Sequence, residues 1–290
     1  ALKVYGDYLW VGSYSFSDPL LRLDRKTLAV ETFPEFSKCA YHIEEYAKDT
    51  LIVSSRNGIS FIDLSSDRPK EFHLPQLNNI RTGPFQKAPD SSLWCGGRNS
   101  SLFNLCRGEI RQIGQFFPEG TEHLDLISRV GVSPVLFDSR GRLWVAIVNR
   151  GMACLDFDEV RIQLYPSLGQ SGFSTYQSAV EDKDGDIWIT SSDGIGVLDP
   201  DKNAYMFFNE DDGLMSGKFR EFSLCLASDG TMYAGLYDGM ISFSYEIFKK
   251  SGKQIPQIVF TEAHLLGNLG DEGTGIGLEQ ERVVLKHNQN

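Results

Sequence analysis

The chain has 290 residues, of which 41% are hydrophobic and 12% aromatic, and its formal net charge is −11 with a pI of about 5.0. This acidity argues against nucleic acid or an anionic membrane surface as a partner, because both are polyanions. The sequence has no stretch of 18 or more apolar residues and therefore no candidate for a membrane-spanning helix.

One phrase recurs along the whole chain: a turn with Asp or Gly, an apolar-aromatic-apolar triplet, and a small residue. Its first copy is Gly6-Asp7-Tyr8-Leu9-Trp10-Val11-Gly12. The central residues of its six copies follow one another at steps of 42, 42, 50, 44 and 45 residues (Trp10, Ile52, Trp94, Trp144, Trp188 and Tyr233). A period of this size, built on strands, is typical of the blades of a β-propeller.

The fifth period illustrates the content of one blade. Its apolar runs predict strands over 178–182, 186–190, 195–199 and 204–208, separated by Asp- and Gly-containing turns. The third of these strands recurs over 58–63, 151–156 and 239–243. We therefore predict an all-β fold, a propeller of four-stranded antiparallel blades with six blades visible.

The aromatic residue of the phrase has a structural interpretation. A large flat ring at mid-strand can fill the wedge between adjacent blades, which we favour over a ligand platform. The small residue that follows suits close approach of the next backbone segment (Gly12, Gly96, Ala146 and Gly235).

The last copy of the repeated phrase lies well before the end of the chain. We expect the propeller to occupy 1–248, a polar linker 249–257, and the start of an incomplete β domain 258–290, with a strand over 258–265 and a Gly-rich stretch over 267–277.

The fifth copy, Asp182-x-x-Gly185-Asp186-Ile187-Trp188-Ile189-Thr190, resembles the blade phrase of a known family, the periplasmic two-component-regulator propellers of hybrid sensor histidine kinases from Bacteroides-type gut bacteria. The linker Asp212-Gly213-Leu214 is similar to the one between blades of that family. The strand after Pro256 looks like the family's junction with an immunoglobulin-like domain. The second and third copies depart from the pattern, with Ile52 in place of Trp and Arg98-Asn99 in the usual Gly position.

The resemblance implies rings of seven blades, so six copies indicate an incomplete ring or part of a larger chain. It also implies a periplasmic location, a kinase elsewhere in the full-length protein, and a homodimer. The cysteines do not decide the location, because the five of them lack metal-ligand spacing and suit small buried apolar positions. Cys95 and Cys106 lie in neighbouring strands of one blade, where a disulfide is the less favoured alternative.

Catalytic and cofactor motifs are absent from the sequence, so we expect no enzyme, cofactor or metal site in this chain. Tyr41-His42-Ile43-Glu44-Glu45 is the single inner-strand candidate for a propeller lyase, against the alternative of a solvated strand. The run Asp182–Asp186 has a calcium-like spacing of oxygens, but a misplaced Gly185 and the short carboxylate of Asp193 favour a turn. Gly273–Gly277 follows no strand and opens no helix, which argues against a dinucleotide loop.

The better functional signal comes from loop positions. In a four-stranded blade, the loop between the second and third strands lies on the same face as the loop that leads into the next blade. An Arg beside an Asn recurs there in blades two to four. The candidate ligand-binding residues on this face are Arg56, Asn57, Arg98, Asn99, Asn149, Arg150, Arg220, Tyr237 and Asp238.

These residue types predict an oligosaccharide site. Arg forms paired hydrogen bonds to carboxylate or sulfate, Asn forms hydrogen bonds to hydroxyls, and Tyr stacks on a sugar ring. An acidic oligosaccharide is the favoured ligand. The alternative is that the arginines cover blade edges or pair with local carboxylates.

Two functions from different classes remain. The resemblance implies an extracytoplasmic sensor domain that detects polysaccharide breakdown products and regulates glycan-utilisation genes, with the remaining propeller and immunoglobulin-like segments of the same protein as partners. The alternative is a protein-interaction propeller without a small ligand. A propeller lyase or glycan-active enzyme comes third.

Overall fold

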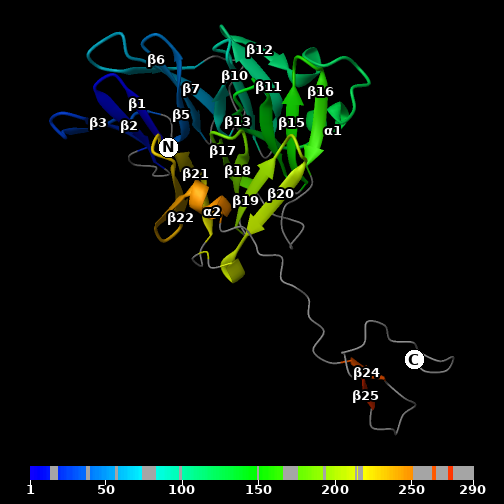
Figure 1. Ribbon diagram of the computed structural model, residues 1–290. Coiled ribbons are helices and arrows are strands. Elements are labelled where there is room, and N and C mark those ends of the chain that lie inside the picture. The colour runs from blue at the N-terminus through cyan, green and yellow to red at the C-terminus, as the bar shows by residue number, and fades with distance from the viewer. Residues whose placement is uncertain are drawn as a thin grey trace. The chain divides into compact units, whose positions relative to one another are not determined.

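The computed structural model describes residues 1–13, 19–36, 40–55, 58–73, 83–97, 100–148, 150–165, 176–191, 194–212, 214, 218–250, 263–265 and 274–276. The chain divides into two units, Ala1–Tyr245 and Glu246–Asn290. The first unit is a β-propeller whose antiparallel sheets follow one another around a ring, which confirms the predicted fold class (Figure 1).

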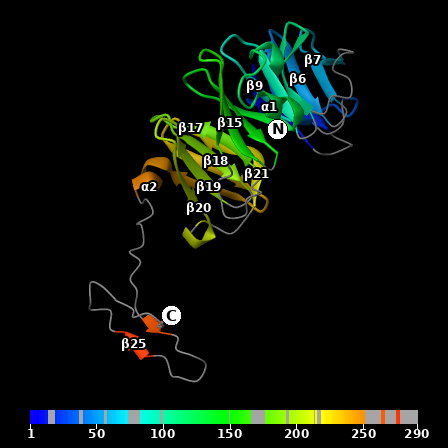
Figure 2. The same cartoon turned by 90° about the vertical axis from the view of Figure 1, so that its right-hand side faces the viewer.

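The strands come in the predicted order and pair as a meander within each blade. Several predicted bounds are matched residue for residue, among them the third strands over 58–63, 151–156 and 195–199. The strands of blade 5 are labelled side by side in Figure 2. The bounds are β1 Leu2–Tyr5, β2 Tyr8–Gly12, β3 Leu20–Asp24 and β4 Val30–Thr32 in blade 1; β5 Ala40–Ala47, β6 Thr50–Ser55, β7 Gly58–Asp63 and β8 Lys70–Phe72 in blade 2; β9 Phe85–Lys87, β10 Leu93–Gly97, β11 Ser100–Cys106 and β12 Glu109–Gln112 in blade 3; β13 Val132–Phe137, β14 Leu143–Ile147, β15 Gly151–Asp156 and β16 Arg161–Tyr165 in blade 4; β17 Tyr176–Glu181, β18 Ile187–Ser191, β19 Ile195–Asp199 and β20 Ala204–Phe208 in blade 5; β21 Phe219–Leu226, β22 Thr231–Leu236 and β23 Met240–Ser244 in blade 6.

An insertion explains the long step of 50 residues between the third and fourth copies of the phrase. It follows β12 and contains the 3₁₀ turn η2 (Ile113–Gln115), the short helix α1 (Leu124–Arg129), and the buried side chains of Ile113, Phe117 and Ile127. These side chains join Trp94 in the core between blades 3 and 4. The insertion thus extends the core of the propeller.

The core lies between blades, as the aromatic residue of the phrase predicted. Trp144 packs against Ile187 and Ile189 of blade 5, and Trp10 packs against Leu51 and Val53 of blade 2. Trp10, Trp144 and Trp188 are fully buried. Burial of this kind leaves no ring face for a ligand, so these tryptophans serve packing.

Close backbone approach explains two of the small residues that end the phrase. A Cβ on Gly12 would lie 2.8 Å from Cβ of Ala40, the first residue of the next blade's inner strand. A Cβ on Gly96 would lie only 2.1 Å from the carbonyl oxygen of Val132, where Gly97 of β10 pairs with Val132 of β13. At Gly235 the crowding comes instead from Ser223 of the same blade.

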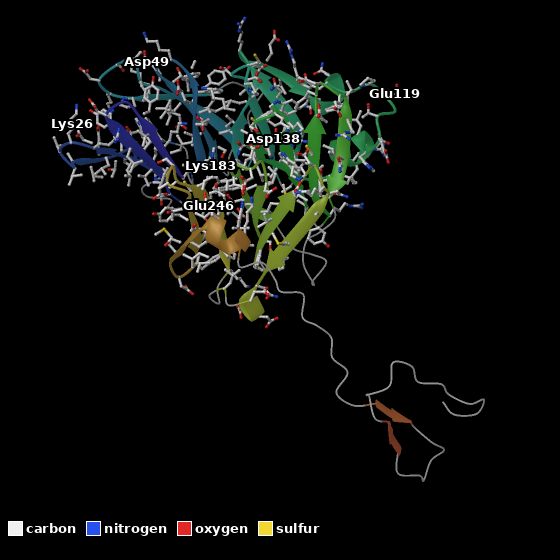
Figure 3. All side chains as sticks on the ribbon, viewed as in Figure 1. Lys26, Asp49, Glu119, Asp138, Lys183 and Glu246 are labelled. Atoms are coloured by element: carbon white, nitrogen blue, oxygen red, sulfur yellow. The ribbon has the colours of Figure 1, made fainter. Side chains whose placement is uncertain are left out.

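A buried aspartate closes the turn between the first two strands in blades 4 and 5. Asp138, labelled in Figure 3, accepts the indole N–H of Trp144 at 2.9 Å and the Nε–H of Arg142 at 2.7 Å. Asp182 accepts the indole N–H of Trp188 at 2.8 Å. The shorter hairpin of blade 1 has no such aspartate, and the buried indole nitrogen of Trp10 has no hydrogen-bond partner among the described residues.

Blades 1 and 6 are less covered than the four blades between them. Leu9 and Val11 of β2 are partly exposed, although the residues at the same positions of β14, Leu143 and Val145, are fully buried. Blade 6 has three strands within the described residues, and the helix α2 (Tyr245–Lys250) follows β23. Apolar side chains therefore stay exposed on these two blades, with Leu2 at 69%, Val4 at 51% and Met240 at 66%.

The second unit is described over all but the first residue of α2 and over two strands, β24 (Ala263–Leu265) and β25 (Thr274–Ile276), which pair antiparallel. The predicted linker begins with the last residues of α2, and its remainder lies outside the described residues. The rest of the predicted incomplete β domain also lies outside them. Within the described part of the chain, no helix has the length and apolar character needed to cross a membrane.

The four described cysteines are free. Cys95 faces Phe103 across the β10–β11 pair, so Cys106 lies three residues further along and the two thiols do not meet. Burial raises the pKa of the Cys95 and Cys154 thiols, in line with the small apolar role predicted for them. Cys225 is exposed, so the prediction of burial is wrong there.

Candidate ligand-binding rim

We use the name arginine rim for the loops between the second and third strands of each blade together with the start of β21. Of the predicted residues, the structure describes Arg150, Arg220, Tyr237 and Asp238. The other predicted positions lie outside the described residues (Arg56, Asn57, Arg98, Asn99 and Asn149).

A bulge at the start of β21 sets the direction of the rim residues in blade 6. Phe219 pairs with Leu236, but the next pair is Leu224 with Ala234, so the residues between them bulge out of the ladder. Phe222 takes a left-handed backbone conformation at φ 56°. A bulge of this kind re-aims side chains that would otherwise alternate across the sheet.

The bulge brings Arg220 against Tyr237. The guanidinium carbon of Arg220 lies 4.0 Å from the centroid of the Tyr237 ring, which is a cation–π contact. The N–H of Tyr237 donates to the carbonyl oxygen of Lys218 at 3.1 Å and ties the two segments together. Tyr237 stays 60% exposed, and Asp238 beside it is also exposed. An exposed ring beside a guanidinium fork can stack on a sugar and bind its carboxylate.

Arg150 occupies the corresponding loop of blade 4, between β14 and β15. Its N–H donates to the carbonyl oxygen of Ile147 at 3.1 Å, and its side chain is exposed. Neither Arg150 nor Arg220 forms an ion pair with any carboxylate in the described ranges.

His42, the candidate for lyase chemistry, lies on the inner strand β5. The N–H of Phe85 donates to its Nδ1 at 3.3 Å, and its ring makes edge contacts with Phe85 and Phe222 at centroid distances of 5.7 and 6.3 Å. Desolvation lowers the pKa of His42 to about 4. Lys3 and the Ala1 amino group add to this effect, and Glu44 opposes it. A histidine held neutral by aromatic neighbours is a weak general base at neutral pH.

We expect His42 to make the propeller sensitive to acid. Its folded-state pKa lies below the unfolded value of 6.5, so the unfolded chain binds a proton first, and stability falls as the pH drops from 6.5 towards 4. Residue His42 as a whole is intermediate in burial, and we expect a loss of about 2 kcal/mol, less than the full value of the shift. Urea unfolding of the wild type and His42→Asn across this pH range measures it. Asn keeps an acceptor for the Phe85 N–H, and equal pH slopes for the two proteins would contradict the prediction.

The run Asp182–Asp186 forms the strand-connecting turn that the sequence favoured. The carboxylate of Asp182 accepts the backbone N–H groups of Asp184 at 2.9 Å and Asp186 at 3.1 Å as well as the Trp188 indole. Within the described residues no group of three or more His, Cys, Asp or Glu side chains is arranged to hold a metal ion.

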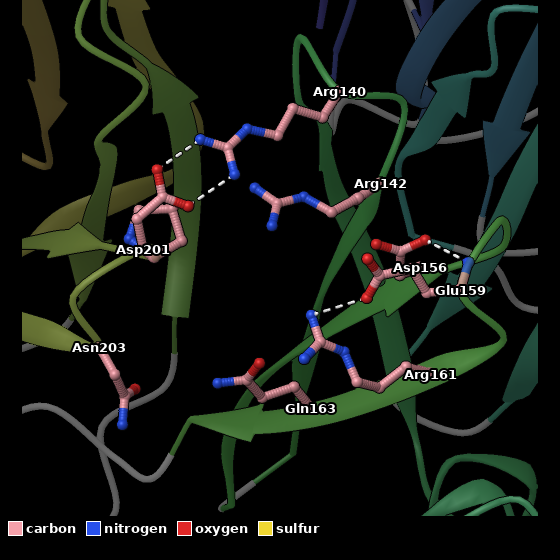
Figure 4. Close-up of a pocket in the computed structure, with 9 residues that line it drawn as sticks. Arg140, Arg142, Asp156, Glu159, Arg161, Gln163, Asp201 and Asn203 are labelled. Atoms are coloured by element: carbon pink, nitrogen blue, oxygen red, sulfur yellow. Dashed lines mark hydrogen bonds and ion pairs between the residues drawn. The ribbon is translucent and has the colours of Figure 1, made fainter.

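The opposite edge of the disc carries a feature that the sequence analysis missed. Arg140 and Arg142, which flank Gly141 in the fourth copy of the phrase, line a hollow together with side chains from β16 and the β19–β20 turn (Figure 4). The two arginines beside Gly141 could have indicated this hollow from the sequence. They lie in the turn that every blade repeats, and we therefore interpreted them only as part of the repeat.

No family model matches the sequence. The chain is 24% identical over 283 residues to a protein named histidine kinase P4 from Formosa agariphila, and the match covers 90% of this chain and 20% of that protein. Its fold is similar to the extracellular domain of a putative hybrid two-component system from B. thetaiotaomicron, with a TM-score of 0.74, 19% identity, and coverage of 98% of this chain and 38% of that one.

A virginiamycin B lyase from Staphylococcus aureus has a similar fold as well, with a TM-score of 0.62, 16% identity, and coverage of 83% of this chain and 78% of that one. The resemblance to the propellers of two-component sensors is thus confirmed. The chain spans 20% of the curated relative and 38% of the first solved chain, so it corresponds to part of each.

Proposed function

We propose that this chain is part of the extracytoplasmic, ligand-sensing region of a hybrid two-component sensor, located in the periplasm. The observation that carries the proposal is its similarity, over nearly its whole length, to an extracellular domain of such a system and to a protein named histidine kinase. Kinase activity and dimerisation belong to the full-length protein in this proposal. The sequence encoded beyond Asn290 provides the first check, because a membrane span and a kinase core must follow.

The proposed ligand is an acidic oligosaccharide that binds at the arginine rim, in line with regulation of glycan-utilisation genes. Arg220 and Tyr237 support this ligand class, because they present a guanidinium and a 60% exposed ring side by side. For a bound glycan to signal, it must bind one arrangement of the propeller and the immunoglobulin-like segments more tightly than another.

Titration of the chain with a panel of acidic and neutral oligosaccharides, followed by calorimetry, tests the rim. We expect Tyr237→Ala and Arg220→Ala each to weaken the best ligand about 10-fold, the effect of losing one stacking or charge-assisted contact. Arg98→Ala and Arg150→Ala extend the test to blades 3 and 4. Arg129→Ala is the matched control, because this arginine is exposed on α1 and pairs with Asp125 at 3.4 Å. Unchanged affinity for the best ligand in all four rim variants would contradict the proposed glycan site.

The exposed apolar side chains of blades 1 and 6 favour a second candidate, protein interaction without a small ligand. Leu2, Val4 and Met240 lie on blades whose outer faces lack the cover that the middle blades have. Under the sensor proposal, further propeller segments of the same protein cover them. The glycan titrations distinguish the sensor proposal from the protein-interaction proposal, because a folded chain that binds no glycan supports protein interaction. A lyase ranks third because His42, its candidate base, is held neutral between aromatic rings.

A further inference from the structure

A hollow of about 410 Å³ lies between blades 4 and 5 (Figure 4). Its walls come from the β13–β14 turn, which carries Arg140 and Arg142, from β16 with Arg161 and Gln163, and from the β19–β20 turn, which carries Asp201 and Asn203. In an antiparallel meander these connections lie on the edge opposite to the loops between the second and third strands. The hollow is therefore separate from the arginine rim.

Ion pairs fix two of the arginines in the wall. Arg140 forms two parallel bonds to Asp201 at 2.6 and 2.5 Å and so joins blade 4 to blade 5. Arg161 pairs with Glu159 at 3.3 Å within blade 4. The Arg140–Asp201 pair thus bridges the two blades that form the walls of the hollow.

Arg142 is different because only part of its guanidinium is committed. Its Nε donates to Asp138, whose side chain is fully buried, and the Arg142 side chain itself is only 11% exposed. The two terminal amino groups of Arg142 have no hydrogen-bond partner among the described residues. The amides of Gln163 and Asn203 likewise make no hydrogen bond within the described part of the chain. In Figure 4 the Arg142 guanidinium and the Gln163 amide extend into the same open space, and the Asn203 amide lies at its edge next to Gln163.

The lining restricts the kind of molecule that fits. Among the described residues that line the wall, Pro200 is the sole apolar one and none is aromatic, which disfavours an aromatic or lipid ligand. A shielded guanidinium with free N–H groups favours an anionic acceptor. Asp156, Glu159 and Asp201 stand against three arginines, so a strongly charged polyanion is disfavoured. The two amides can bond hydroxyls on either side of a single carboxylate.

We propose that this hollow is a second ligand site, which takes one small hydroxylated monocarboxylate of the hexuronic acid class. The volume of 410 Å³ is near the lower end of the range for ligand pockets, about 300–1,000 Å³, and suits one sugar rather than a chain of them. The carboxylate pairs with the terminal amino groups of Arg142, and the ring hydroxyls bond Gln163 and Asn203. The site is independent of the proposed rim because no residue is shared between them.

Saturation-transfer NMR and calorimetry with D-glucuronate at millimolar concentrations test the site, with D-glucose and acetate as matched probes. We expect glucuronate to bind, and both glucose and acetate to bind at least 10-fold more weakly. Gln163→Ala and Asn203→Ala should each weaken glucuronate about 5-fold, and the double variant more than 10-fold, as expected for lost hydrogen bonds. Both side chains lack partners in the described structure, so these variants should fold.

Arg142→Lys keeps a positive charge beside Asp138 but removes the fork, and we expect it to abolish measurable binding. If this variant does not fold, the Gln163→Ala and Asn203→Ala variants still test whether glucuronate binds in the hollow. Arg220→Ala, which weakens the rim, should leave glucuronate affinity unchanged, so the two sites can fail separately. The proposal is overturned if the wild type does not bind glucuronate, if the double variant binds it normally, or if glucose or acetate binds equally well.

Discussion

Replacing Asp138 with Ala is expected to lower the free energy of unfolding by about 3–5 kcal/mol, the largest effect of any single substitution that we propose. The side chain of Asp138 is fully buried and accepts hydrogen bonds from the Arg142 guanidinium, the Trp144 indole and two backbone N–H groups. Alanine leaves a shielded arginine and a buried indole N–H without an acceptor, and each unsatisfied group carries a desolvation penalty. Urea unfolding monitored by circular dichroism measures the loss.

Two further variants separate the causes. Asp138→Asn keeps an acceptor without the charge, and we expect a smaller loss of about 1–2 kcal/mol. Asp182→Ala removes the matching bond to Trp188 in blade 5, where Asp186 stands in place of Arg142. A loss for Asp138→Ala no greater than that for Asp182→Ala would show that the buried ion pair adds nothing.

Gly96→Ala is expected to destabilise the propeller by about 3 kcal/mol, at the upper end of the range for overpacking. Its Cβ would lie 2.1 Å from the carbonyl oxygen of Val132 and 3.2 Å from Cδ of Pro134. The overlapping atom belongs to backbone, which cannot rotate away as a side chain could. Relief therefore requires blades 3 and 4 to separate where Gly97 pairs with Val132.

Gly114→Ala is the matched control for this substitution. A Cβ there meets no heavy atom within 4 Å, and Gly114 has no left-handed backbone conformation. We expect its thermal unfolding midpoint to equal that of the wild type. A wild-type midpoint for Gly96→Ala as well would mean that the blades tolerate a wider spacing than their paired backbones indicate.

Much of the fold could be predicted from the sequence because each blade repeats its local signals. The third strands over 58–63 and 151–156 begin at a Gly and end at an Asp, and these turn residues mark the strand bounds directly. The burial of Trp144 and Trp188 also follows from the repeat, since a ring at mid-strand has only the next blade to pack against.

Features that depart from the repeat could not be predicted in the same way. The helix α1 lies in a stretch with no counterpart in the other periods. The bulge in β21 arises from a mismatch in pairing between two strands, which a single strand's pattern does not contain. The hollow beside Arg142 combines residues from two blades, and only the packing of the blades brings Asn203 near Gln163.

The pairing of Gly97 with Val132 also bears on how movement could pass around the disc. It joins the strands of blades 3 and 4 into one continuous sheet, whereas the strands of blade 5 form a sheet of their own. A backbone pairing, even at one pair of residues, limits how far two neighbouring strands can slide past each other. Blades 3 and 4 are thus joined at this point by backbone as well as by side chains. At the border between blades 4 and 5, where Arg140 pairs with Asp201, a relative movement of the two blades would change the width of the hollow.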